Sequence, residues 1–209
     1  MSKLVVRKGG TDLQKLASSI RKKRESRATA AAKIDRVILF DGSGSMGATD
    51  AVDLNGMPCS RWGALEYAWQ VLASSDLAKG RLGAYVFSSG LVPVRGSASG
   101  KIVDLPYVGQ GTEMCRALKT AAAHRNARLR VLLVSDGEAT DGSPAEVVGA
   151  AVAIGSPVDT VYVGPKNGPG RDTLRRVAEA TGGEFRDMGG SFDASRFLAN
   201  CQSFLRLKS

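Results

Sequence analysis

The sequence feature that most constrains the fold is an apolar run that ends in an acid and a glycine-serine loop. Residues 37–40 read Val-Ile-Leu-Phe, and Asp41 follows them, with Ser43 and Ser45 at alternate positions beyond it. A continuous apolar run of this length is typical of a buried parallel strand. A carboxylate at the end of such a strand is costly to bury unless something compensates its charge. The stretch therefore predicts a strand that opens onto a polar site.

Two later stretches offer further oxygen donors. The apolar run at 131–134 leads through Ser135 to Asp136, and a glycine-flanked Thr112 follows another extended segment. If the two acid-tipped strands lie side by side in a parallel sheet, both acids open at its carboxyl edge, where open α/β sheets place ligands. Carboxylates and hydroxyls that converge on one point suit a hard cation. The interpretation requires that these side chains converge and that no protein cation closes the site.

In these motifs the chain resembles the von Willebrand factor A (VWA) domain family. The metal-ion-dependent adhesion site (MIDAS) of that family reads Asp-x-Ser-x-Ser, then a distant Thr and a distant Asp. The matching positions stand in the same order, and they are Asp41, Ser43, Ser45, Thr112 and Asp136. The resemblance covers roughly residues 34–207.

The resemblance carries several expectations about function. It implies an intact MIDAS that binds Mg2+, with Mn2+ or Ca2+ suited to the same oxygens. It implies a protein partner that presents a Glu or Asp carboxylate to the metal. It also implies an adhesion or scaffold module for protein-protein interaction rather than an enzyme, with no catalytic residue.

The charge of the chain is concentrated at its start. Residues 1–36 hold 11 Lys or Arg and 3 Asp or Glu, a net +8, whereas the remaining residues hold 18 and 17, a net +1. We therefore expect a basic, partly helical N-terminal arm at 1–33 and a VWA domain at 34–209. An alternative function follows from the arm, which would bind nucleic acid or an acidic surface and use the VWA fold as a scaffold. The arm has no aromatic side chain for base stacking.

The composition indicates in which cellular compartment we expect the protein. No apolar run approaches the roughly 20 residues that cross a bilayer, and no apolar segment follows the basic N-terminus as in a signal peptide. Cys59, Cys115 and Cys201 are odd in number and far apart, which argues against a disulfide framework, and His124 is the only histidine, which argues against a Cys/His zinc site. We expect a cytoplasmic protein without membrane contact. The resemblance then extends to intracellular bacterial members, some of which act with MoxR-type AAA+ ATPases.

Strand and helix patterns alternate along the rest of the chain. We expect strands at 37–41, 81–87, 128–135, 157–163 and 184–186, an edge hairpin at 91–94 and 101–105, and helices at 61–75, 113–125, 144–154, 172–181 and 194–207. The stretch 48–60 is predicted to be a polar loop in which Asp50 and Asp53 are solvated turn residues, with the alternative that they flank the metal. This alternation predicts an α/β fold of the doubly wound, Rossmann-like kind, with a mostly parallel sheet, helices on both faces and one antiparallel edge strand.

Two enzyme-like patterns overlap the first strand and its loop. Residues 42–47 satisfy Gly-x-Gly-x-x-Gly, but the dinucleotide fingerprint needs a helix that starts within the motif, and here a polar loop follows. The strand that ends at Asp41 also resembles the first motif of haloacid-dehalogenase phosphatases, which carry a second acid two residues on. Ser43 stands at that position, so the general acid of a phosphotransferase is missing.

Overall fold

The computed structural model describes residues 16, 18–19, 34–74, 82–94 and 105–206. Contacts within the chain divide it into two units, Met1–Lys33 and Ile34–Ser209. In the first unit, the described residues Leu16, Ser18 and Ser19 are helical. The rest of the predicted arm lies outside the described residues, so its role stays a prediction.

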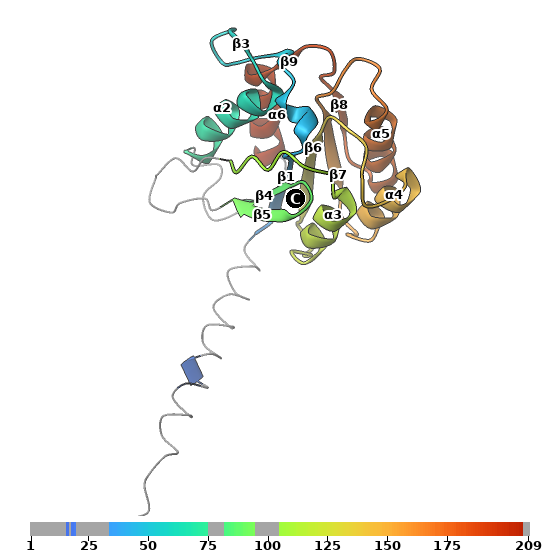
Figure 1. Ribbon diagram of the computed structural model, residues 1–209. Coiled ribbons are helices and arrows are strands. Elements are labelled where there is room, and N and C mark those ends of the chain that lie inside the picture. The colour runs from blue at the N-terminus through green and yellow to red at the C-terminus, as the bar shows by residue number, and fades with distance from the viewer. Residues whose placement is uncertain (1–15, 17, 20–33, 75–81, 95–104, 207–209) are drawn as a thin grey trace, which may run out of the picture. The chain divides into compact units, whose positions relative to one another are not determined.

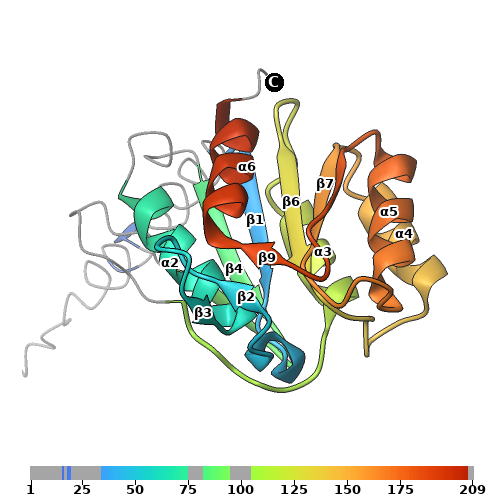
Figure 2. The same cartoon turned by 90° about the horizontal axis from the view of Figure 1, so that it is seen from above.

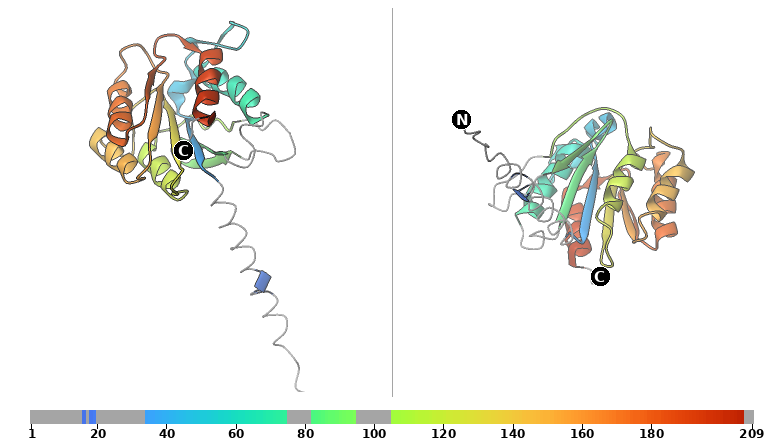
Figure 3. Two further views of the ribbon diagram at one scale, coloured as in Figure 1. Left: turned by 180° about the vertical axis from the view of Figure 1, so that it is seen from behind. Right: turned by 90° about the horizontal axis from the view of Figure 1, so that it is seen from below.

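A six-stranded sheet forms the centre of the second unit (Figure 1). Its strand order is β5-β4-β1-β6-β7-β8, and every neighbouring pair is parallel except β4 and β5. The view from below in Figure 3 shows β4, β1 and β6 side by side. The strands are β1 (Arg36–Asp41), β4 (Leu82–Phe87), β5 (Leu91–Val94), β6 (Arg130–Ser135), β7 (Val158–Tyr162) and β8 (Phe185–Asp187). The predicted mostly parallel sheet with an antiparallel edge strand is confirmed.

Helices cover both faces of this sheet (Figures 1 and 2). They are α2 (Arg61–Ala73), α3 (Met114–Ala122), α4 (Pro144–Val152), α5 (Gly170–Thr181) and α6 (Ala194–Arg206). Because side chains alternate along a strand, Ile38 and Phe40 join the core under α2 and α6, whereas Val37 and Leu39 join the core under α3, α4 and α5. This alternation accounts for the unbroken apolar run of β1, which is buried on both sides.

The stretch 48–60 is more ordered than the sequence predicts. It contains β2 (Ala51–Val52) and β3 (Pro58–Cys59), which form a second sheet with β9 (Phe192–Asp193) in the order β3-β2-β9. Asp53 lies in the turn between β2 and β3, where its carboxylate accepts the backbone N–H groups of Asn55 and Met57 at 2.8 and 2.9 Å. The segment around Asp53 is a turn, as predicted, but Asp53 is buried rather than solvated, and the strands on either side of the turn were not predicted.

Other expectations about the body of the fold have clear outcomes. Trp62 and Trp69 are buried in the core under α2 and α6. Of the predicted hairpin partner at 101–105, residues 101–104 lie outside the described residues, and Leu105 is buried but forms no strand. All three cysteines are free thiols. None of the helices in the described ranges has both the length and the apolar character that crossing a bilayer requires.

Candidate metal centre

Strand β1 delivers Asp41 to the carboxyl edge of the sheet. Asp41 is the last residue of the strand and is 0% exposed. The neighbouring strand β6 runs parallel to β1 and is followed directly by Asp136, which is 3% exposed. Because the two strands share one direction and one register, both acids come to the same edge, as the sequence predicts.

The loop after β1 is held by one apolar anchor. Residues Gly44–Gly47 form a 3-10 turn, and Met46 within it is fully buried in the core. The backbone N–H of Ser43 donates to Asp41 Oδ1 at 2.8 Å, which turns the chain sharply after the strand. The 3-10 helix ends at Gly47 and the next α-helix, α2, begins only at Arg61, so no α-helix starts within residues 42–47 as the dinucleotide fingerprint requires.

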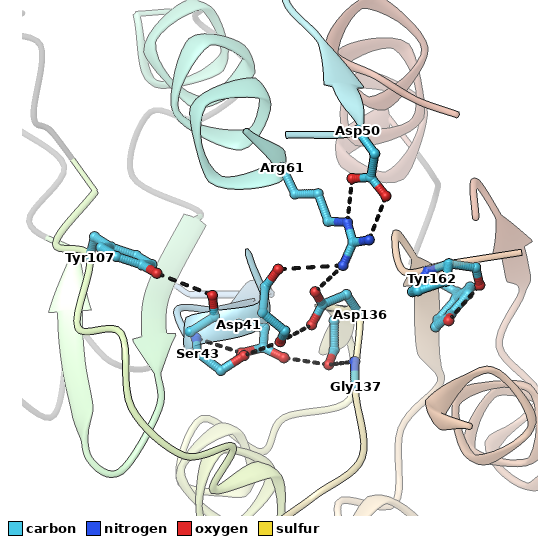
Figure 4. A network of polar contacts seen from close by, with 12 residues as sticks. Asp41, Ser43, Asp50, Arg61, Tyr107, Asp136, Gly137 and Tyr162 are labelled. Atoms are coloured by element: carbon cyan, nitrogen blue, oxygen red, sulfur yellow. Dashed lines mark hydrogen bonds and ion pairs between the residues drawn. The ribbon is translucent and has the colours of Figure 1, made fainter. Parts of the chain in front are cut away.

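A chain of hydrogen bonds joins four of the five predicted residues (Figure 4). The hydroxyls of Ser43 and Ser45 lie 3.0 Å apart, and Ser45 Oγ donates to Asp136 Oδ1 at 2.8 Å. Ser135 Oγ donates to the second oxygen of Asp41, Oδ2, at 2.5 Å. The structure therefore brings both acids and both serines into one polar cluster, from two strands that lie far apart in the sequence.

Thr112 lies at the same edge of the sheet, but it is not part of the hydrogen-bond chain that joins the other four residues. Its backbone N–H donates to Thr140 Oγ1 at 2.9 Å, and its carbonyl accepts the N–H of Thr140 at 2.9 Å. This pair fastens the Thr112 loop to the loop after β6. The Gly109 N–H also donates to Gly42 O at 2.8 Å, so the Thr112 loop packs on the serine loop as well. Among the described residues, the Thr112 hydroxyl makes no hydrogen bond to the four clustered side chains.

Arg61, the first residue of α2, places a buried guanidinium against the cluster (Figure 4). Its Nη1 donates to Asp136 Oδ2 at 2.5 Å, while Nε and Nη2 bind the Asp50 carboxylate at 2.7 and 2.5 Å. The hydrogen bonds from Arg61 hold the pKa of Asp50 below its usual value. Asp50 is exposed in the loop, as predicted, but its carboxylate is also an ion-pair partner of Arg61, which the sequence did not predict.

Arg61 neutralises only part of the negative charge at this edge. It occupies Oδ2 of Asp136, whereas Oδ1 of the same carboxylate accepts from Ser45. Asp41 has only neutral partners within the described part of the chain, the Ser43 N–H and the Ser135 hydroxyl. Among the described residues, Arg61 is thus the one cation paired within this group of three carboxylates, Asp41, Asp50 and Asp136, which leaves the group a net charge of −2 when all three are ionised.

The burial of Asp41 is electrostatically costly. Burial raises the pKa of Asp41 to about 6, against the hydrogen bonds from Ser135 and Ser43, which lower it. The nearby Asp136 carboxylate contributes to this rise in the pKa. A buried carboxylate that lacks a cationic partner and lies beside a second carboxylate is the electrostatic setting that a bound cation would relieve.

The donor set fits a small divalent cation. Adjacent ligands around octahedral Mg2+, at bond lengths of about 2.1 Å, lie about 3.0 Å from each other. The Ser43–Ser45 and Ser45–Asp136 oxygen pairs lie 3.0 and 2.8 Å apart. Ser45 is exposed at the surface, whereas Asp41 and Ser43 are buried, so the cluster has an outer side that a partner can reach. The two surplus negative charges match the charge of the ion.

Sequence reasoning missed several polar residues at this edge. The sequence pattern places Ser135 at the end of a predicted strand and Arg61 at the start of a predicted helix, and it assigns neither residue a role at the site. Ser88 lies one residue beyond β4, and its buried hydroxyl has no hydrogen-bond partner among the described residues. A serine next to an acid at a strand end is a usable signal for Ser135. Arg61 carries no comparable signal, because its partner Asp136 is 75 positions away.

Metal sites built from three or more His, Cys, Asp or Glu side chains are absent from the described residues. The cluster is of another kind, because it combines two carboxylates with hydroxyl groups. Neither a scan against protein-family models nor a search of curated proteins found a match to the chain.

Comparison with solved structures identifies the fold. A von Willebrand factor type A protein from Catenulispora acidiphila aligns with a TM-score of 0.58 and 18% identity over 83% of this chain and 42% of its own. The ArnB paralog VWA2 from Sulfolobus acidocaldarius aligns with a TM-score of 0.59 and 18% identity over 85% of this chain and 46% of its own. The SpRpn10 VWA domain aligns with a TM-score of 0.59 and 13% identity over 81% of this chain and 95% of its own. The chain thus spans less than half the length of the first two proteins and nearly all of the isolated domain, and its fold is that of the VWA domain.

Proposed function

We propose that this chain is a non-catalytic, divalent-cation-dependent module that binds a carboxylate of a protein partner. The observation that carries the proposal is the burial of Asp41 without a cationic partner among the described residues, beside two serine hydroxyls and a second carboxylate. A dication would offset the charge that Arg61 leaves uncompensated. The VWA fold supports the proposal as a scaffold on which such a site is found at the sheet edge.

The residues that would hold the ion are Asp41, Ser43, Ser45, Thr112 and Asp136. When bound, Mg2+ supplies a positive charge with a coordination position that an anionic oxygen can occupy, and Mn2+ or Ca2+ suits the same donors. Arg61 would hold Asp136 in place through Oδ2, so that Oδ1 stays turned toward Ser45. The exposed Ser45 marks the side from which a partner would approach.

The proposal also covers the class of the protein partner and the cellular location of the protein. A protein partner with an exposed Glu or Asp fits the charge and the opening of the site. A MoxR-type AAA+ ATPase and a cytoplasmic location follow from the resemblance to intracellular VWA proteins.

An array of paired peptides tests the function. Each peptide carries one Glu in varied sequence contexts, and its twin carries Gln at the same position. We expect the protein to bind a subset of the Glu peptides in Mg2+, and to lose that binding both in chelator and on the Gln twins. Binding that is equal for Glu and Gln peptides, or equal with Mg2+ and with chelator, would contradict the proposal.

A further inference from the structure

A polar cavity lies at the same edge of the sheet as the candidate metal centre. Its volume is about 340 Å³, within the range of small-ligand pockets. It is formed by the loop after β7, the first turn of α5, the segment after β8 and the first turn of α6. The polar side chains that line it are Lys166, Asn167, Arg171, Asp187, Ser191 and Arg196.

The charge of this cavity is positive. Arg171 Nε pairs with Asp187 Oδ2 at 2.5 Å, so those two charges cancel. No ion pair involves the side chains of Lys166 or Arg196 within the described residues. Two cations therefore line the cavity without an acidic partner there, next to the donor groups of Asn167 and Ser191. Such a cavity attracts an anionic group.

The loop that carries part of the cavity lies next to the candidate metal centre. A Cβ atom at Gly164 would lie 2.5 Å from Asp136 O, and one at Gly170 would lie 2.1 Å from Gly137 O, so the loop after β7 packs directly on the backbone that carries Asp136. The Tyr162 hydroxyl donates to Pro165 O at 2.8 Å and holds this loop (Figure 4). The loop that carries the cavity residues Lys166 and Asn167 thus lies directly beside the backbone that carries Asp136.

We propose that this cavity binds a second acidic side chain of the same partner segment that the metal centre captures. The inference rests on the proposed function and adds the class of partner, which is a segment with two spaced carboxylates. The cluster lies at the ends of β1 and β6, and the cavity lies beside the ends of β7 and β8. Two strand spacings are about 10 Å. A segment in the polyproline II conformation spans about 9 Å in three residues and presents residues i and i+3 on the same face. The segment would therefore carry acids at positions i and i+3.

Amide NMR shifts of Gly189 and Ser191 test the cavity without any metal. The probe is a blocked peptide, Glu-Ser-Ser-Glu, added in chelator at low salt, with Gln-Ser-Ser-Gln as its neutral twin. We expect saturable shifts with the Glu peptide alone, and at least about tenfold weaker binding to a Lys166→Glu/Arg196→Glu variant, because two attractive charges become repulsive. The matched control is Lys119→Glu/Arg128→Glu, which changes two exposed cations elsewhere by the same charge and is expected to bind as the wild type does.

The outcomes separate this inference from the proposed function. Equal binding to all three proteins, or no shift with the Glu peptide, would overturn the cavity assignment. Displacement of the peptide by a tenfold lower concentration of inorganic phosphate would overturn it as well, and would reassign the cavity to phosphate. Repeating the titration in Mg2+ tests the metal centre. Stronger binding in Mg2+ that the cavity variant retains in full would leave the proposed function standing and overturn the second subsite. Unchanged binding in Mg2+ would sustain the cavity and contradict the proposed function.

Discussion

The substitution Asp41→Asn is expected to stabilise the metal-free protein and to abolish its stabilisation by Mg2+. Asp41 is fully buried, and burial raises its pKa to about 6 from 3.8, which means that the folded protein disfavours the ionised form. An asparagine keeps the shape, accepts from the Ser43 N–H and donates to Ser135 Oγ, but it carries no charge. We expect a gain of about 2 to 3 kcal/mol in the free energy of unfolding above pH 7, since one pKa unit corresponds to about 1.4 kcal/mol.

The stability difference between wild type and Asp41→Asn is expected to depend on pH in a defined direction. Because the folded-state pKa of Asp41 is raised, its contribution to stability is fully present below pH 3.8 and is lost as the pH rises through about 6. The difference between wild type and variant should therefore grow over that interval and level off above it. Urea unfolding in chelator at a series of pH values measures it, with Glu138→Gln, an exposed loop acid, as the control. A variant that is less stable than the wild type at pH 8 would show that the Asp41 charge is already compensated.

The substitution Gly170→Ala is expected to destabilise the fold by about 3 kcal/mol, as overpacking against backbone does. A Cβ atom at Gly170 would lie 2.1 Å from Gly137 O and 2.4 Å from Gly137 C, and neither atom belongs to a flexible side chain. Either α5 or the loop that follows Asp136 must then move. We therefore expect the variant to lose much of its response to Mg2+ as well as its stability.

Gly149 provides the matched control for that change. It lies within α4, and an added Cβ atom would have no neighbour within 4 Å. Gly149→Ala should therefore raise the free energy of unfolding by about 0.5 to 1 kcal/mol, because alanine is the better helix former. Urea unfolding of both variants measures the contrast. Equal stability of the two would contradict the packing of α5 on the Asp136 loop.

Most strands of the main sheet could be predicted from the sequence, because the patterns that indicate them are local. The unbroken apolar run before Asp41 reflects a strand covered on both faces, and the small residues after it reflect a tight turn pinned by Met46. The same kind of pattern marked β6 and Asp136. Parallel pairing then brings the two acids together without further information, since the carboxyl ends of parallel strands share an edge.

What the sequence did not reveal depends on long-range packing or on very short elements. Strands β2, β3 and β9 have two residues each, so they show no periodicity. Arg61 reads as an ordinary helix residue until α2 is placed against β6, where its guanidinium meets Asp136. Asp50 gains its role only through Arg61. These residues bridge elements that lie far apart along the chain, and no spacing rule connects them.

The most direct measurement is a calorimetric titration of Mn2+ and Mg2+ into the wild type, Asp41→Asn and Glu138→Gln. Glu138→Gln removes one charge from an exposed residue close to Asp136, so it controls for net charge near the site. The account predicts saturable binding at one site in the wild type and in Glu138→Gln, and no saturable binding in Asp41→Asn. Equal heats from the wild type and Asp41→Asn would contradict a metal centre built on Asp41.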